Sequence, residues 1–231
     1  MEHESSPGTI LVTGGASGLG AAVADAVEKA GGIPIVLDIA EPRQGVAWER
    51  VDLADTRAAE AAVRRVAGSL QGLDAVVTAA GVDACGDLLD VPAEAWERVV
   101  AVNLLGTAAV VRAAMPFLER RQGKVVTVAS TLGLRPLPAA TAYCASKFGI
   151  IGFTRALAAE LAGRVGVTLL IPGGMQTAFF DGRPERFKPA PDAQLNRPED
   201  VAQAVLFALR QPPGCEVREL VIAPSMETSW P

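Results

Sequence analysis

The 231-residue sequence contains a single histidine, His3, and only three cysteines. One histidine close to the N-terminus excludes a Ser-His-Asp triad and a histidine-ligated metal site. The cysteines, Cys85, Cys144 and Cys215, are widely spaced and form no CxxC pair, so neither a disulfide framework nor a zinc site is expected. Proton transfer must therefore fall to other side chains, and a reducing cytoplasm fits this cysteine usage.

The sequence also lacks a basic stripe, a secretory leader and a long uncharged run. Lys and Arg total 21 against 26 Asp and Glu, which argues against a nucleic-acid partner. The first six residues carry acids where a signal peptide needs positive charge. The longest nearly uncharged stretch, residues 99–111, is too short to span a bilayer. We therefore expect a cytoplasmic protein with neither a membrane nor a nucleic acid as partner.

Short apolar runs alternate with longer segments of helical period along the whole chain. This alternation predicts βαβ units and a mostly parallel, doubly wound sheet, and the length fits a single α/β domain over residues 1–231. We expect strands at residues 9–12, 33–37, 46–51, 75–78, 124–128, 167–170 and 219–223. We expect helices at residues 19–30, 56–69, 93–120 with a break near 103–106, 141–162 and 198–210.

The first expected strand runs into TGGASGLG at residues 13–20. Gly14, Gly18 and Gly20 would allow a tight turn, close approach of backbone N–H groups to a phosphate, and close packing of helix on strand. Position 21 is Ala, where a Walker loop would carry Lys, so nucleoside triphosphate hydrolysis is disfavoured. The stretch predicts dinucleotide binding rather than a plain glycine turn.

An acid, Asp38, ends the second expected strand, 18 residues after Gly20. A carboxylate at this place can accept hydrogen bonds from an adenosine ribose and would repel a 2'-phosphate, so it favours NAD over NADP. Arg43 is the nearby cation that could soften this preference. The alternative is that Asp38 only caps a turn.

Three further places in the chain are ambiguous when taken alone. Asp52 and Leu53 follow the third expected strand and could border an adenine ring. The run TAAG at residues 78–81 would let a loop pass close to a ligand, but small residues also ease ordinary packing. Asn103 lies in an apolar helical stretch, where its amide must find partners or cost on the order of 1–3 kcal/mol. It could simply bond the backbone at the helix break.

Tyr143 is the only tyrosine in the chain, and Lys147 follows it by four positions. On a helix these side chains share one face, and an adjacent cation favours the phenolate and lowers the phenol pKa. The pair therefore suits acid/base chemistry, although an amphipathic helix with an incidental Tyr and Lys has the same spacing. Ser130 follows the fifth expected strand, where it could meet Tyr143 over a cofactor.

In order and spacing, these motifs resemble a classical short-chain dehydrogenase/reductase. The matching residues run from Thr13 to about Ala223 and are TGGASGLG, Asp38, Asp52, TAAG, Asn103, Ser130, YCASK, and Pro172-Gly173 followed by Thr177. The resemblance implies one Rossmann domain, a seven-stranded sheet in order 3-2-1-4-5-6-7 and a nicotinamide cofactor. One departure is TAAG, where the family more often has NNAG, which affects the hydrogen bonding on the cofactor side.

The resemblance also implies a role for each matching residue. Tyr143 would be the general acid/base, Lys147 would lower its pKa and bind the nicotinamide ribose, and Ser130 would orient the substrate oxygen. Asn103 would hold a water of the proton relay, and Thr177 would contact the carboxamide. The full expected cofactor set is Thr13, Gly14, Ser17, Gly18, Leu19, Gly20, Asp38, Asp52, Leu53, Ala79, Ala80, Gly81, Tyr143, Lys147, Pro172, Gly173 and Thr177.

The expected substrate side follows Thr177, where a Pro-rich segment, about residues 174–197, reads as a lid. Leu132, Leu134 and Leu137 suggest an apolar pocket. Three lid cations could meet an acidic group or be solvated, and solvation is the expected state: Arg183, Arg186 and Lys188.

The leading hypothesis is an NAD-preferring oxidoreductase that acts on a secondary alcohol or ketone. The alternatives are an NADPH-dependent 3-oxoacyl-thioester reductase and a non-catalytic regulator that senses a dinucleotide. A homodimer or homotetramer is expected because the helix at residues 141–162 presents small and apolar positions away from the catalytic face: Ala142, Ala145, Phe148, Gly149 and Gly152.

Overall fold

The computed structural model describes residues 6–70 and 72–227, so His3 lies outside it. Its framework is a seven-stranded sheet in the order β3-β2-β1-β4-β5-β6-β7, with every pair of neighbours parallel. The strands are β1 (Thr9–Thr13), β2 (Ile33–Asp38), β3 (Ala47–Arg50), β4 (Ala75–Thr78), β5 (Lys124–Val128), β6 (Gly166–Pro172) and β7 (Glu219–Ile222). The predicted Rossmann order is confirmed.

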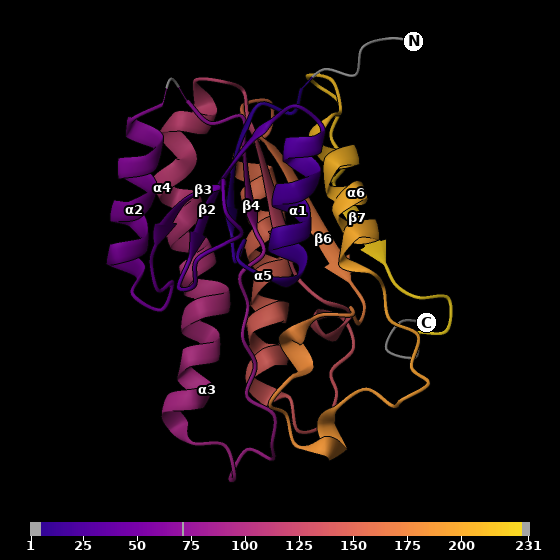
Figure 1. The fold of residues 1–231 in the computed structure, drawn as a ribbon. Helices are drawn as coiled ribbons and strands as arrows, with labels where there is room; N and C mark the ends of the chain where they lie inside the picture. The colour runs from indigo at the N-terminus through magenta and orange to yellow at the C-terminus, as the bar shows by residue number, and fades with distance from the viewer. Residues whose placement is uncertain (1–5, 71, 228–231) are drawn as a thin grey trace.

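Helices cover both faces of the sheet, as Figure 1 shows. One face carries α1 (Gly18–Lys29) and α6 (Pro198–Leu209), which pack against each other; the other carries α2 (Thr56–Gly68), α4 (Thr107–Glu119) and α5 (Thr141–Glu160). Successive strand residues point to opposite faces. In β1, Ile10 and Val12 therefore enter the core under α1 and α6, while Leu11 enters the core under α2 and α4.

The predicted helix break near residues 103–106 is wrong, because the chain stays helical from α3 (Ala93–Val100) into α4. The join is a π-helical segment, η1 (Ala101–Gly106), which widens the helix locally instead of ending it. Glycine is favoured at position 106, because the Cβ of any other residue would lie 2.7 Å from the backbone oxygen of Leu53. The sequence signal of a break was a real local irregularity.

Within the described residues, the continuous helix Ala93–Glu119 is long and apolar enough to meet a length-and-composition test for a bilayer span. The nearly uncharged stretch at residues 99–111, which is too short to span a bilayer, is only part of the helix that forms. Over its most apolar window, 56% of this helix is buried inside the fold. A core helix passes the same test, and the packing of α4 on α2 accounts for the apolar composition.

Because all strands are parallel, their carboxyl ends open on one edge of the sheet. The segment at residues 174–197 extends beyond this edge, next to the N-terminal half of α5 (Figure 1). It contains two short 3-10 helices, Ala178–Phe180 and Glu185–Phe187, and its ends are joined by a bridge between Met175 and Asn196.

The expected outer face of α5 is only partly exposed. Ala142 is buried, and Gly149 packs on Leu104, where a Cβ would approach to 2.7 Å. Phe148 is exposed, and Gly152 has open space beside it. Ala145 is exposed as well, so a contact surface on α5 would use Ala145, Phe148 and Gly152 and not the whole predicted set.

Candidate active site

A cavity of about 820 Å³ lies at the carboxyl edge of the sheet. This is within the range of roughly 300–1,000 Å³ typical of ligand pockets. Every predicted site residue lines it except Thr13, Gly20 and Asn103. Residues scattered over 160 positions of sequence are therefore gathered in one place by the parallel strand order.

Thr13 and Gly20 lie directly behind the cavity wall. The Thr13 Oγ1 accepts a hydrogen bond from the Ala80 backbone N–H at 3.2 Å, which ties β1 to the loop after β4. At Gly20, a Cβ would lie 2.1 Å from the Gly14 oxygen. Any side chain at this position would therefore push the glycine turn apart, so both residues shape the turn from behind.

The glycine turn forms a cradle that suits a pyrophosphate. Gly14 and Gly18 have positive φ angles of 71° and 53°, and a Cβ on Gly14 would lie 2.6 Å from the Ala80 Cα. Ser17, at the N-cap of α1, makes no side-chain capping bond, and the first turn carries no acid. The N-terminal N–H groups and the positive end of the helix dipole therefore face the cavity, which fits the phosphates of a nicotinamide dinucleotide.

Asp38 was expected either to face the ribose of a cofactor or to cap a turn, and its position in the structure suits both. Its carboxylate lines the cavity, and it also accepts hydrogen bonds from the N–H groups of Ala16 at 2.9 Å and Ala40 at 3.0 Å. Arg43, which we expected could soften the cofactor preference, instead pairs with Asp25 and Glu28 of α1. It is not part of the cavity wall, because these acids hold it on the outer surface.

The far end of the cavity is bordered by Asp52 and Leu53, as predicted, and by Arg98, which sequence reasoning missed. Arg98 contacts the Asp52 carboxylate at 3.0 Å, and the Ala54 N–H donates to the same side chain. Partial burial raises the pKa of Asp52, but these two interactions outweigh burial and leave that pKa lowered. Arg98 lies one helical turn before Val102, another lining residue, and this spacing was a weak indication of its place on the wall.

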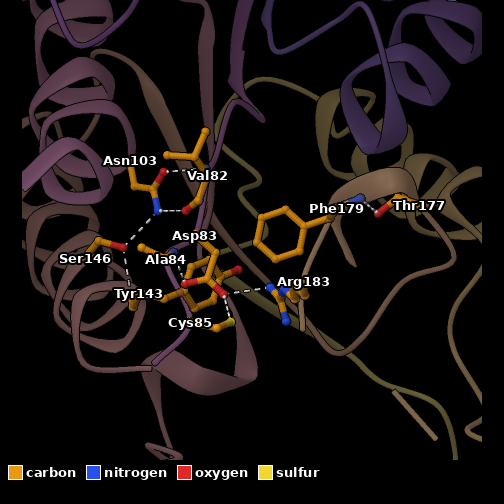
Figure 2. A network of polar contacts seen from close by, with 10 residues as sticks. All are labelled: Val82, Asp83, Ala84, Cys85, Asn103, Tyr143, Ser146, Thr177, Phe179 and Arg183. Carbon is orange, nitrogen blue, oxygen red and sulfur yellow. Dashed lines mark hydrogen bonds and ion pairs between the residues drawn. The ribbon is translucent and has the colours of Figure 1, made fainter. Parts of the chain in front are cut away.

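Asn103 is buried and uses its whole amide on the protein, as Figure 2 shows. Its Oδ1 accepts from the Val82 N–H at 2.8 Å, and its Nδ2 donates to the Val82 oxygen at 2.9 Å. A second Nδ2 bond, 3.0 Å long, reaches Ser146 Oγ, which in turn donates to the Tyr143 backbone oxygen. Asn103 therefore fixes the loop after β4 against the start of α5.

The structure brings Ser130, Tyr143 and Lys147 together on one wall of the cavity. Ser130 and Tyr143 are hydrogen-bonded through their side chains. The Lys147 Nζ lies 5.5 Å from the centroid of the Tyr143 ring and donates to the Val128 backbone oxygen at 2.9 Å. The predicted side-by-side placement on one helix face is confirmed.

The protonation of this group differs from the sequence expectation. Burial raises the pKa of Tyr143 to about 12, against an opposing effect from the Ser130 hydrogen bond. Burial also lowers the pKa of Lys147 to about 8. The expectation that Lys147 brings the phenol pKa toward neutrality is therefore wrong for this structure. Desolvation has the larger effect on the pKa of Tyr143. The Lys147 Nζ is bonded to the Val128 carbonyl and lies 5.5 Å from the centroid of the tyrosine ring.

A buried ion pair joins the segment 174–197 to the loop after β4. Arg183 contacts Asp83 at 2.7 Å, and the two side chains are only 16% and 7% exposed. The guanidinium also lies over the rings of Phe179 and Phe180, 4.7 Å from each centroid. Phe179 in turn faces Tyr143 at 5.6 Å (Figure 2). Our expectation that Arg183 is solvated is wrong.

The remaining predicted substrate-side residues divide between the cavity and other surroundings. Leu132 and Leu137 line the cavity, whereas Leu134 packs into a core cluster with Ile150. Arg186 stacks on its neighbour Phe187, and Lys188 lines the cavity while pairing with Glu185.

The wall also contains two residues near the C-terminus that no sequence pattern indicated, Met226 and Glu227. The Glu227 Oε2 accepts a hydrogen bond from the Gly174 N–H at 3.1 Å. Nothing in the local sequence predicts that a chain end returns to the carboxyl end of β6.

Comparison with known proteins agrees with this geometry. The short chain dehydrogenase family matches residues 8–186. The chain is 34% identical to 2-(S)-hydroxypropyl-CoM dehydrogenase 3 of Xanthobacter autotrophicus, over 87% of this chain and 88% of that protein. It is 36% identical to the inactive 2-(S)-hydroxypropyl-CoM dehydrogenase 2 of the same organism, over 71% and 76%.

A solved structure has the same fold. The alcohol dehydrogenase from Thermococcus sibiricus, in complex with 5-hydroxy-NADP, superposes with a TM-score of 0.82 at 24% identity and covers 93% of this chain and 95% of that one.

The Asp83–Arg183 pair gives a test of how segment 174–197 is held. In a double-mutant cycle with Asp83→Asn and Arg183→Met, we expect a coupling energy of about 1–3 kcal/mol in urea unfolding, because each single change strands a buried charge. The exposed pair Arg155–Glu219 is the matched control, with an expected coupling below about 1 kcal/mol. Equal coupling in the two cycles would contradict the buried-pair assignment.

Proposed function

The chain belongs to the short-chain dehydrogenase family, and from this premise we propose that it interconverts a secondary alcohol and a ketone with a nicotinamide dinucleotide. The observation that carries the proposal is the grouping of Ser130, Tyr143 and Lys147 on one cavity wall, next to the phosphate cradle at Gly14 and Gly18. The name of the Xanthobacter relative, a hydroxypropyl dehydrogenase, supports the substrate class.

Tyr143 is the proposed proton carrier, because the chain has no other tyrosine and its one histidine is His3. During oxidation the phenolate oxygen accepts the hydroxyl proton of the alcohol; during reduction the phenol returns a proton to the carbonyl oxygen. Ser130, already hydrogen-bonded to Tyr143, holds the substrate oxygen within reach. When bound, the cofactor supplies the hydride acceptor or donor, and in its oxidised form it adds a positive charge.

Lys147 has two proposed tasks in this mechanism. Its Nζ has three donors, one of which bonds Val128, so the others are available to ribose hydroxyls. With a pKa of about 8, the side chain is mostly an ammonium at neutral pH, and its charge favours the phenolate of Tyr143. Because the phenol pKa of about 12 is far above neutrality, alcohol oxidation should accelerate as pH rises.

The substrate would enter on the side walled by Leu132, Leu137, Phe179 and Phe180. These apolar side chains favour a substrate with an apolar body around its hydroxyl group. We propose that residues 174–197 act as a lid on a single domain spanning residues 1–231. The Asp83–Arg183 pair would hold this lid over Tyr143.

Two alternatives keep some support. A dinucleotide-binding protein without turnover is favoured by the inactive relative, which shows that membership of this family does not guarantee activity. A 3-oxoacyl-thioester reductase would use the same catalytic group with NADPH, and Asp38 opposes it through its charge.

The first test replaces Tyr143 with Phe, which keeps the ring against Phe179 and removes the hydroxyl. We expect alcohol-dependent NAD reduction to fall at least ~100-fold, within the range for losing a general acid/base. NADH binding, followed by fluorescence titration, should change little. Full activity in this variant would overturn the mechanism, and absence of turnover in the wild type with intact NADH binding would favour the regulator.

The second test concerns the cofactor. Asp38 would repel a 2'-phosphate, so we expect NADPH to bind at least about tenfold more weakly than NADH, a difference of about 1.4 kcal/mol. Asp38→Ser removes the negative charge, so it should strengthen NADPH binding and reduce the difference in affinity between the two cofactors. The structure of the Thermococcus relative with 5-hydroxy-NADP means that the fold alone does not decide the matter. Tighter binding of NADPH by the wild type would refute the NAD preference.

We also propose a cytoplasmic homodimer or homotetramer. The exposed Phe148 on α5 and Phe207 on α6 are apolar surface that a subunit contact would cover. A monomer mass by light scattering at micromolar concentration would contradict the oligomer.

A further inference from the structure

We infer that Glu227 makes the site selective for the oxidised form of its nicotinamide cofactor. This carboxylate comes from the segment after β7, far in sequence from the rest of the site, yet it lies on the wall that also carries Tyr143, Lys147 and Thr177. The inference rests on the proposed function, because it concerns the end of the cavity where the nicotinamide ring would lie.

The segment after β7 is held on the end of β6 by several contacts. Gly173 N–H donates to the Ile222 oxygen at 2.8 Å, and the Glu227 N–H donates to the Pro224 oxygen at 2.9 Å to close a turn. The Glu227 Oε2 then accepts from the Gly174 N–H at 3.1 Å. The carboxylate is therefore positioned by backbone contacts and is not a freely moving surface charge.

Gly173 is the residue that lets this carboxylate approach. A Cβ at this position would lie 2.7 Å from the Glu227 Oε2 and 3.2 Å from the Ala223 Cβ. The segment after β7 thus packs directly on the Pro172–Gly173 turn. Thr177 and Lys147, which the resemblance places at the nicotinamide end of the cofactor, line the same wall, so Glu227 adds a negative charge at that end.

The charge of Glu227 is what distinguishes the two cofactor forms. The nicotinamide ring is positive when oxidised and neutral when reduced, so a fixed carboxylate nearby favours the oxidised form. Two cations of the same wall lie on the other side of this balance. Lys147 opposes the bias, whereas Arg183 is paired with Asp83. The carboxylate of Glu227 acts against the charge of Lys147.

The test measures the dissociation constants of NAD and NADH separately for the wild type, Glu227→Gln and Glu227→Asp. Gln keeps an oxygen that can accept from Gly174 but removes the charge, whereas Asp keeps the charge on a shorter side chain. We expect Glu227→Gln to weaken NAD relative to NADH by about three- to tenfold, the size expected for a partly exposed charge several ångströms away. Glu227→Asp should restore at least part of the ratio.

The matched control is Glu219→Gln, which removes a carboxylate of β7 that pairs with Arg155 and is not part of the cavity wall. Its ratio of NAD to NADH affinity should equal that of the wild type. If Glu227→Gln weakened the binding of NAD and NADH equally, Glu227 would have only a structural role and the inference would be overturned. Unchanged dissociation constants for both forms would overturn it as well. Failure of the wild type to bind either form would refute the proposed function itself.

Discussion

The removal of water from around Tyr143 and Lys147 is the constraint on which the rest of the site depends. Burial pushes the two pKa values apart, raising that of the phenol to about 12 and lowering that of the ammonium to about 8. Both shifts favour the neutral side chains. The surrounding groups modify the effect of burial on Tyr143. Ser130 and Arg183 lower the pKa of the phenol, whereas Asp83 raises it.

The fold supplies the surroundings that make such burial possible. Parallel strands deliver their loops to one edge, and the π-helical segment holds Asn103 where its amide can bond both Val82 and Ser146. This amide supplies hydrogen-bond partners to the loop after β4 and to the first turns of α5. The cavity wall beside Tyr143 is therefore rigid, which a proton carrier needs in order to hold its partners in place.

Local sequence patterns predicted the features that depend on neighbouring residues. The glycine cradle and the shared helix face of Tyr143 and Lys147 follow from spacing along the chain, whereas the strand order was implied by the resemblance to a known family. Features formed between distant segments escaped prediction. Arg183 meets Asp83 across 100 positions, and Glu227 meets Gly174 across 53. The pKa of Tyr143 was misjudged for the same reason, since spacing shows a nearby cation but not the loss of solvent.

Because Tyr143 is the only tyrosine, its ionisation can be followed directly by phenolate absorbance in rapid pH-jump experiments, read before the protein unfolds. Burial keeps this phenol protonated until a positive cofactor charge favours the phenolate. We therefore predict a midpoint near 12 for the protein alone, above the ~10 of an unfolded chain, and a lower midpoint with NAD bound. A midpoint of ~10 that NAD leaves unchanged would contradict it.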